Sequence, residues 1–134
     1  MILGNLDAKR DWGYAPEYVE GMWRILQHKE PLDIVLATGK QNTVREFVEL
    51  AFKEIDIKIK WIGSGLDEYG VNIKNNKKIV YVDSKYYRPT EVASLLGDPT
   101  LAREKLGWKS NTSFESLVQI MVRADIENMM KNGN

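Results

Sequence analysis

The chain has 134 residues, 43% of them hydrophobic, which is enough for one domain with a buried core and too little for two ordinary domains. Its 19 lysines and arginines balance 19 aspartates and glutamates, which excludes attraction of nucleic acid or an anionic membrane by bulk charge. The absence of cysteine excludes a disulfide and a thiolate nucleophile. Because no apolar run approaches the ~20 residues of a membrane span and no signal-peptide pattern is present, we predict one cytoplasmic domain over residues 1–134.

The first third of the chain combines strand-like and helical patterns. Residues 1–6 favour a short strand, which leaves Arg10 on a loop or strand end. Pro16 suits the first turn of a helix over residues 16–28. The apolar run 34–37 is typical of a strand buried in a parallel or mixed sheet. The apolar side chains at helical spacing in the first helix are Val19, Met22, Trp23 and Leu26.

A second helix is indicated by the capping box of Thr43 and Glu46. After it, the alternation over residues 57–61 predicts a half-buried strand with a basic outer face. The glycine- and asparagine-rich stretch 63–78 predicts an exposed loop or hairpin, the segment most prone to disorder, and residues 79–82 predict a last strand. In the second helix we expect a buried stripe of Val44, Phe47, Val48, Ala51 and Ile55, and outward Arg45, Glu49, Lys53 and Glu54.

Two more helices are expected near the C-terminus. Asp98 followed by Pro99 is typical of a helix start, and Gly107 of a helix end. Thr112 and Glu115 form a capping box for the last helix. The packed side of that helix is expected to be Phe114, Leu117, Val118 and Met121. The whole pattern predicts a mixed α/β domain.

The candidate binding residues are Arg10 and the pair Arg88 and Glu91. A guanidinium offers a planar fork of donors that suits phosphate oxygens, and a carboxylate three residues away can accept hydrogen bonds from a vicinal diol such as a ribose. The alternative is that both arginines form local surface ion pairs, Arg10 with Asp11 and Arg88 with Glu91. Spacing alone leaves both interpretations open.

Two other features do not indicate a site. Tyr81 and Lys85 have the Tyr-x-x-x-Lys spacing of short-chain dehydrogenases, but that chemistry needs one helix face, and Tyr81 lies in a β-branched run where four residues span about 13 Å. His28 is the only histidine, and without cysteine it does not predict a metal site.

Several blocks of the sequence resemble the C-terminal part of the GDP-mannose 4,6-dehydratases, which are extended short-chain dehydrogenases. The match runs over nearly the whole chain, and its Arg-Asp-Trp-Gly and Arg-Pro-Thr-Glu-Val blocks are specific in combination. The blocks are residues 3–13, 37–39, 44–48, 86–92, 96–100 and 105–109.

The resemblance implies an NADP-dependent lyase. Such an enzyme oxidises the mannosyl C4, removes the C5 proton, expels the C6 hydroxyl as water and returns the hydride to C6, which converts GDP-mannose to GDP-4-keto-6-deoxymannose. It also implies that Arg10 and Arg88 bind the diphosphate, that Glu91 binds the ribose and that Asn5 lies near the guanine.

The family's glycine-rich NADP motif, its Tyr-x-x-x-Lys helix and its residues at the sugar ring have no counterpart in this chain. We therefore expect a small mixed α/β substrate-binding domain without the Rossmann half, with no catalytic residue and no NADP site of its own, inactive alone, from a homo-oligomeric parent enzyme. The alternatives are a non-catalytic nucleotide-sugar binding or subunit-interaction module, and part of a related epimerase or reductase.

Overall fold

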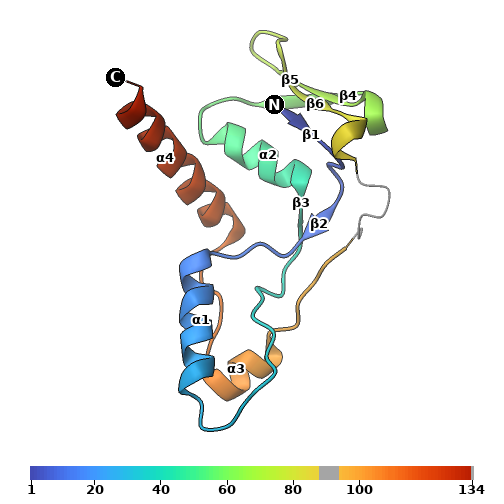
Figure 1. Cartoon of the computed structure of the whole chain (residues 1–134). Helices are drawn as coiled ribbons and strands as arrows, with labels where there is room; N and C mark the ends of the chain where they lie inside the picture. The colour runs from blue at the N-terminus through green and yellow to red at the C-terminus, as the bar shows by residue number, and fades with distance from the viewer. Residues whose placement is uncertain (88–93, 134) are drawn as a thin grey trace. The chain divides into compact units, whose positions relative to one another are not determined.

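The computed structural model describes residues 1–87 and 94–133 (Figure 1). Contacts within the chain form two compact units, each treated separately below. Unit one contains residues 1–8, 43–87 and 118–133, and unit two contains residues 9–42 and 94–117. The single domain expected over residues 1–134 stays a prediction. The helices are α1 (Ala15–Gln27), α2 (Val44–Lys53), α3 (Thr100–Leu106) and α4 (Phe114–Asn132).

Unit one is built on a mixed four-stranded sheet with the order β1-β6-β5-β4. The outer strand β1 runs parallel to β6, whereas β5 is antiparallel to both of its neighbours. Together with the four helices, this mixed sheet gives the α/β fold class that the sequence predicted. The strands of this sheet are β1 (Ile2–Leu3), β4 (Ile59–Ile62), β5 (Tyr69–Asn72) and β6 (Lys78–Val82), while β2 (Lys9–Arg10) and β3 (Asn42–Thr43) form a separate pair.

Of the exposed loop or hairpin expected over residues 63–78, the hairpin is present, because β5 pairs with β6 in antiparallel orientation. The expected exposure is wrong for β5, which is an inner strand of the sheet. Val71 and Asn72 are buried there. Gly70 has no room for a side chain, since an added Cβ would lie 2.9 Å from the Ile59 side chain and 3.0 Å from the Trp61 ring. Glycine and asparagine are depleted in strands, so the usual sequence signal for an inner strand is absent.

Helix α2 begins as expected, because the Thr43 hydroxyl accepts from the Glu46 N–H and the Glu46 carboxylate accepts from the Thr43 N–H. Val48 is buried, but Ile55 is exposed, contrary to the expected stripe. Arg45 does not point outward. Its guanidinium forms a two-pronged ion pair with Glu68, whose side chain is only 9% exposed, at 2.5 and 3.0 Å.

Two further contacts complete this charged cluster in unit one. Asp7 accepts from Arg45 Nη2 at 2.8 Å, and the guanidinium lies 4.9 Å from the centroid of the Trp61 ring. The hydrogen bonds that Arg45 donates to Glu68 raise the pKa of Arg45; burial opposes this rise, and the hydrogen bond to Asp7 adds to it. The cluster joins α2, which lies beside the sheet in Figure 1, to the segment before β5.

In unit two, α1 has proline in its first turn as predicted, but it turns its apolar stripe outward. Its inner side is marked by Gly21, where an added Cβ would lie 2.7 Å from Leu36 and 3.0 Å from the buried indole of Trp108. Helical spacing would place Trp23 on the packed side of α1, but that residue is 59% exposed. Val19, Met22 and Leu26 are exposed as well.

The predicted strand at residues 34–37 is also not formed within the described part of the chain. Leu32, Ile34 and Leu36 are half-buried, whereas Asp33 and Val35 are exposed. This period of two is typical of extended backbone, but no neighbouring strand pairs with it among residues 1–87 and 94–133. The prediction of an extended apolar segment is therefore correct, and the described residues contain no strand that pairs with it.

The sequence signals for where the two C-terminal helices begin and end are confirmed only in part. Gly107 ends α3 with a positive φ of 60° as predicted. The capping box of Thr112 and Glu115 is wrong, because the Thr112 hydroxyl donates to Glu17 and the Ser113 hydroxyl instead accepts from the Ser116 N–H at 3.1 Å. In α4, Leu117 and Val118 are buried as expected, and Met121 is exposed. No described helix is both long and apolar enough to cross a membrane.

Glu17 of α1 holds the segment between α3 and α4. Its carboxylate accepts from the Ser110 hydroxyl at 2.8 Å and from the N–H and hydroxyl of Thr112 at 3.0 and 2.8 Å, and its backbone oxygen accepts from the Trp108 indole at 2.7 Å. Burial alone would raise the pKa of Glu17, but these donors outweigh it and lower the pKa below its usual value.

We predict that Glu17 stabilises the folded protein near neutral pH and that this stabilisation is lost in acid. A lowered folded-state pKa gives a stabilising contribution that is present above the usual pKa of about 4.5 and is lost as the pH falls through the folded-state value. Urea unfolding should show Glu17→Gln less stable than wild type at about pH 6, with a smaller difference at about pH 3.5. The control is Glu20→Gln, which alters an exposed pair with Arg24 on the same helix. An equal Glu17→Gln difference at both pH values would contradict this role.

Candidate functional site

The segments that follow β1 and β6 leave the sheet at the same edge, because the two strands are parallel. Leu3 lies opposite Val82, and the Asp83 N–H donates to the Leu3 carbonyl at 2.9 Å. In open α/β sheets, ligands bind beyond the carboxyl ends of such strands. The sheet thus brings Gly4 together with the segment from Asp83 that leads toward Arg88 in sequence.

Gly4 is in close contact with this second segment. A Cβ added to Gly4 would lie 2.1 Å from the carbonyl oxygen of Tyr86, so only glycine fits there. The predicted site residue Asn5 follows at once, and its side-chain oxygen accepts from the Asp7 N–H at 3.0 Å. Asn5 therefore stands in a turn that the backbone packing fixes at the edge of the sheet.

Arg10 ends β2 in unit two, as the sequence predicted. It lines an open cavity of about 340 Å³, and its Nη1 donates to the carbonyl of Lys9 at 2.7 Å. Tyr18 also lines this cavity. Burial and the carboxylates of Asp11 and Glu17 raise the pKa of the Tyr18 hydroxyl, so it is protonated near neutral pH and is not a base. The remaining lining residues are Asp11, Val35, Leu36, Ala37, Leu95, Leu96 and Gly97.

Asp11 binds the loop that follows residues 34–37. Its Oδ1 accepts from the N–H and the hydroxyl of Thr38 at 2.9 and 2.5 Å, and its Oδ2 accepts from the Gly39 N–H at 2.9 Å. Both carboxylate oxygens thus have donors from this loop, which gives Asp11 a structural role. Gly39 has a φ of 74°, a conformation that favours glycine.

The structure describes two of the four predicted binding residues, Asn5 in unit one and Arg10 in unit two. Arg88 and Glu91 lie outside the described residues. Their contacts, and the choice between a phosphate clamp and local ion pairs, stay predictions.

Tyr81 and Lys85 do not share a helix. Tyr81 lies in β6 and Lys85 in a short 3₁₀ turn (Ser84–Tyr86), which confirms that their spacing is not that of a dehydrogenase catalytic helix.

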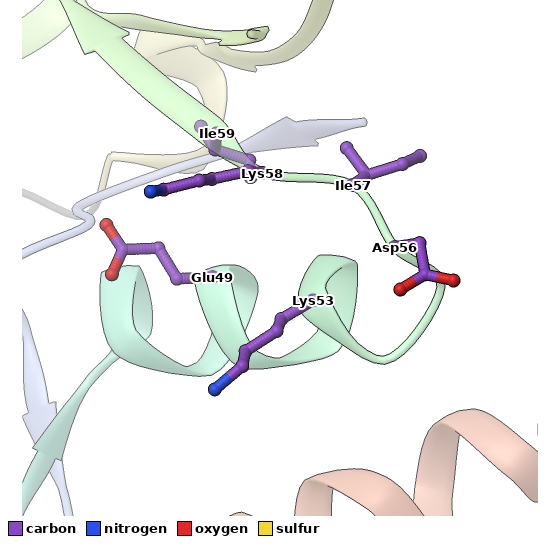
Figure 2. Close-up of a pocket in the computed structure, with 6 residues that line it drawn as sticks. All are labelled: Glu49, Lys53, Asp56, Ile57, Lys58 and Ile59. Atoms are coloured by element: carbon purple, nitrogen blue, oxygen red, sulfur yellow. The ribbon is translucent and has the colours of Figure 1, made fainter. Parts of the chain in front are cut away.

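A second cavity, of about 560 Å³, lies in unit one beside α2 and the start of β4 (Figure 2). Glu49 points toward the side where Lys58 also ends, and Glu49 accepts from the Trp61 indole at 2.6 Å. Two lysines and two carboxylates line the cavity, so their charges cancel and we assign it no ligand. The lining residues are Glu49, Lys53, Asp56, Ile57, Lys58 and Ile59.

Comparison with solved structures first defines the fold. The chain is similar to part of the UDP-glucose 4-epimerase from Thermotoga maritima solved with UDP-glucose, with a TM-score of 0.71 and 19% identity over 95% of this chain and 34% of that chain. It is similar in the same way to the dTDP-glucose 4,6-dehydratase from Bacillus anthracis solved with NAD, with a TM-score of 0.68 and 16% identity over 96% of this chain and 35% of that one. The fold is therefore that of one part of the short-chain dehydrogenase-type epimerases and dehydratases.

Sequence comparison then gives the family. The family model described as GDP-mannose 4,6 dehydratase matches residues 1–121, and the chain belongs to that family. It is 54% identical to the GDP-mannose 4,6 dehydratase of Dictyostelium discoideum over all of this chain and 37% of that protein. It is also 54% identical to the Homo sapiens protein of the same name, over 98% of this chain and 36% of that protein. The chain thus spans little more than a third of the length of these relatives.

Proposed function

We propose that this chain is the nucleotide-sugar-binding part of a GDP-mannose 4,6-dehydratase, an NADP-dependent lyase that converts GDP-mannose to GDP-4-keto-6-deoxymannose. The observation that carries the proposal is the family match over residues 1–121. The sequence relatives above, at 54% identity, are dehydratases of GDP-mannose, whereas the epimerase above shares the fold at 19% identity. This difference favours the dehydratase over an epimerase or reductase.

In this proposal Arg10 and Arg88 bind the diphosphate and Glu91 accepts from the ribose hydroxyls. Charge-assisted hydrogen bonds from a guanidinium suit phosphate oxygens, and the position of Arg10 at a strand end on an open cavity supports its part. The turn at Asn5 supports a role next to the nucleotide, because it lies where two parallel strands end.

NADP, which supplies hydride transfer in this proposal, does not fit the described part of the chain. The nearest candidate turn, Gly63-Ser64-Gly65, leads into a 3₁₀ helix of only three residues (Gly65–Asp67). A dinucleotide site needs a glycine-rich turn at the start of a longer helix that follows a strand in a βαβ unit. We therefore assign NADP and the catalytic groups to polypeptide that the longer relatives have and this chain does not match, and we derive no step through them.

The proposal predicts that this chain alone does not dehydrate GDP-mannose in the presence of NADP. A chimera in which it replaces the matching 37% of the Dictyostelium relative should be active. Both proteins are assayed for the keto sugar product, with the relative itself as the positive control. Turnover by the isolated chain, free of contaminating enzyme, would contradict the assignment of catalysis to the other part. An inactive but folded chimera would contradict the proposed identity of the site.

A further inference from the structure

Asp7 presents an exposed carboxylate in the same turn as Asn5. Its side chain is 77% exposed, and both hydrogen bonds that it accepts from Arg45, at 3.3 and 2.8 Å, reach the single oxygen Oδ1. The backbone N–H of Arg45 also donates to the carbonyl of Leu6 at 2.9 Å, so the same arginine holds the turn through its main chain and its side chain. The position of the Asp7 carboxylate is therefore fixed while most of its surface stays open.

The charged cluster of Asp7, Arg45 and Glu68 carries one negative charge more than it balances. The single guanidinium serves two carboxylates and binds Glu68 with two of its nitrogens. The Glu68 side chain is 9% exposed, so Asp7 is the accessible member of the pair. The excess negative charge is thus offered at Asp7 to a further hydrogen-bond donor.

The side-chain amide of Asn5 has a defined direction. Its Oδ1 accepts from the Asp7 N–H at 3.0 Å, and because a backbone N–H can only donate, the NH2 group is the opposite end of the amide. The turn thus combines an acceptor, the Asp7 carboxylate, with a donor, the Asn5 NH2, two residues apart. Both follow β1, at the edge of the sheet where the parallel strands β1 and β6 end.

This combination of groups matches one edge of a guanine base. Guanine carries two adjacent N–H donors, at N1 and N2, beside the acceptor O6, so a carboxylate can accept from both donors while an amide NH2 donates to O6. Uracil has one N–H between two carbonyl oxygens, so a carboxylate that accepts from this N–H also faces a carbonyl oxygen. Attraction to the first base and repulsion of the second both favour guanine.

We propose that Asp7 selects the guanine base by accepting from its N1–H and N2–H, and that Arg45 is a positioning residue that holds Asp7 in place. The inference rests on the proposed function, because it puts the base at the turn of Asn5. It adds a specificity-determining residue to that site.

Three nucleoside diphosphates that differ only in the base test the contact with N2. IDP lacks the N2 amino group of GDP, and xanthosine diphosphate has a carbonyl oxygen in its place. Calorimetric titration of this chain and of the chimera should show GDP binding at least tenfold tighter than IDP, because IDP loses one charge-assisted hydrogen bond. Equal affinities for GDP and IDP would overturn the proposed contact.

Asp7→Asn should produce a switch of base preference that a purely structural residue does not produce. The asparagine keeps one acceptor oxygen, but its NH2 opposes the N2 amino group of guanine and suits the carbonyl oxygen of xanthine. The variant should bind GDP at least tenfold more weakly than wild type and xanthosine diphosphate at least tenfold more tightly. The matched control is Asp67→Asn, which alters another exposed carboxylate of unit one and should keep the wild-type preference.

The titrations distinguish failure of this inference from failure of the proposed function. If the wild-type protein binds GDP and Asp7→Asn leaves the order of the three affinities unchanged, Asp7 forms only a surface ion pair and the inference is wrong, while the proposed function stands. If the folded wild-type chain and the folded chimera both fail to bind GDP, the proposed function is contradicted and this inference with it. Circular dichroism shows that each variant is folded before it is titrated.

Discussion

Replacing Arg45 by alanine is expected to cost about 3–5 kcal/mol of unfolding free energy, because it leaves a buried carboxylate without its partner. Glu68 is 9% exposed and binds the guanidinium through both oxygens. The substitution also removes the cation above the Trp61 ring and the link to Asp7. The resulting loss should be much larger than that from an ordinary surface ion pair.

Urea unfolding followed by circular dichroism measures this loss, with two comparison variants. Arg45→Lys keeps the charge but lacks the planar fork and the stacking surface, so its stability should fall between those of wild type and Arg45→Ala. Arg123→Ala breaks the pair with Glu54, in which the arginine is 66% exposed, and should cost at most about 1 kcal/mol. If Arg45→Ala were no more destabilising than Arg123→Ala, the cluster would have no special role in stability.

The second large effect is expected at Arg88, where alanine should weaken GDP binding tenfold or more. Loss of a charge-assisted hydrogen bond to phosphate costs about 1.5–3 kcal/mol, and each 1.4 kcal/mol is a factor of about ten in Kd. Calorimetric titration of the chimera with GDP measures the change. Arg88→Lys should recover only part of the affinity, because lysine has no bidentate geometry.

Lys85→Ala is the matched control for Arg88→Ala. Lys85 is an exposed cation three residues earlier, with its Nζ 5.8 Å from the centroid of the Tyr86 ring. If the site recognises phosphate through a guanidinium, the Lys85 variant should keep nearly full affinity. Unchanged affinity in Arg88→Ala would instead favour the local ion pair with Glu91.

Local sequence signals predicted the helix ends best. The capping box of Thr43 and Glu46 and the glycine at position 107 act within a few residues, and both were confirmed. Arg45 was misplaced because its partner Glu68 is 23 residues away, so helical spacing alone put it on the outer face. A buried ion pair between distant segments leaves no local pattern in the sequence.

The strands show the same division between local and distant causes. The alternation of β4 was recognised, but β5 was missed because Gly70 is selected by the Ile59 and Trp61 side chains of the neighbouring strand. Residues 34–37 carry a genuine strand pattern whose partner is absent from the described chain.

For the candidate site, the sequence placed Arg10 on a loop or strand end. It did not predict the turn at Asn5, and Asn5 itself was indicated only by the resemblance. The parallel pairing of β1 and β6 explains that turn, and no sequence pattern predicts such pairing between residues nearly eighty positions apart. The site residues themselves were suggested by their chemistry and by the family blocks. Arg88 and Glu91 stay predictions until binding is measured.

The most direct test of the central claim is calorimetric titration of this chain with GDP, and with UDP as comparison, after circular dichroism has shown that it is folded. The account predicts saturable binding of GDP that is tighter than that of UDP, because the phosphate and base contacts come from residues of this chain. Failure of the folded chain to bind either nucleotide would contradict the claim that Arg10, Arg88, Glu91 and Asn5 form the nucleotide site.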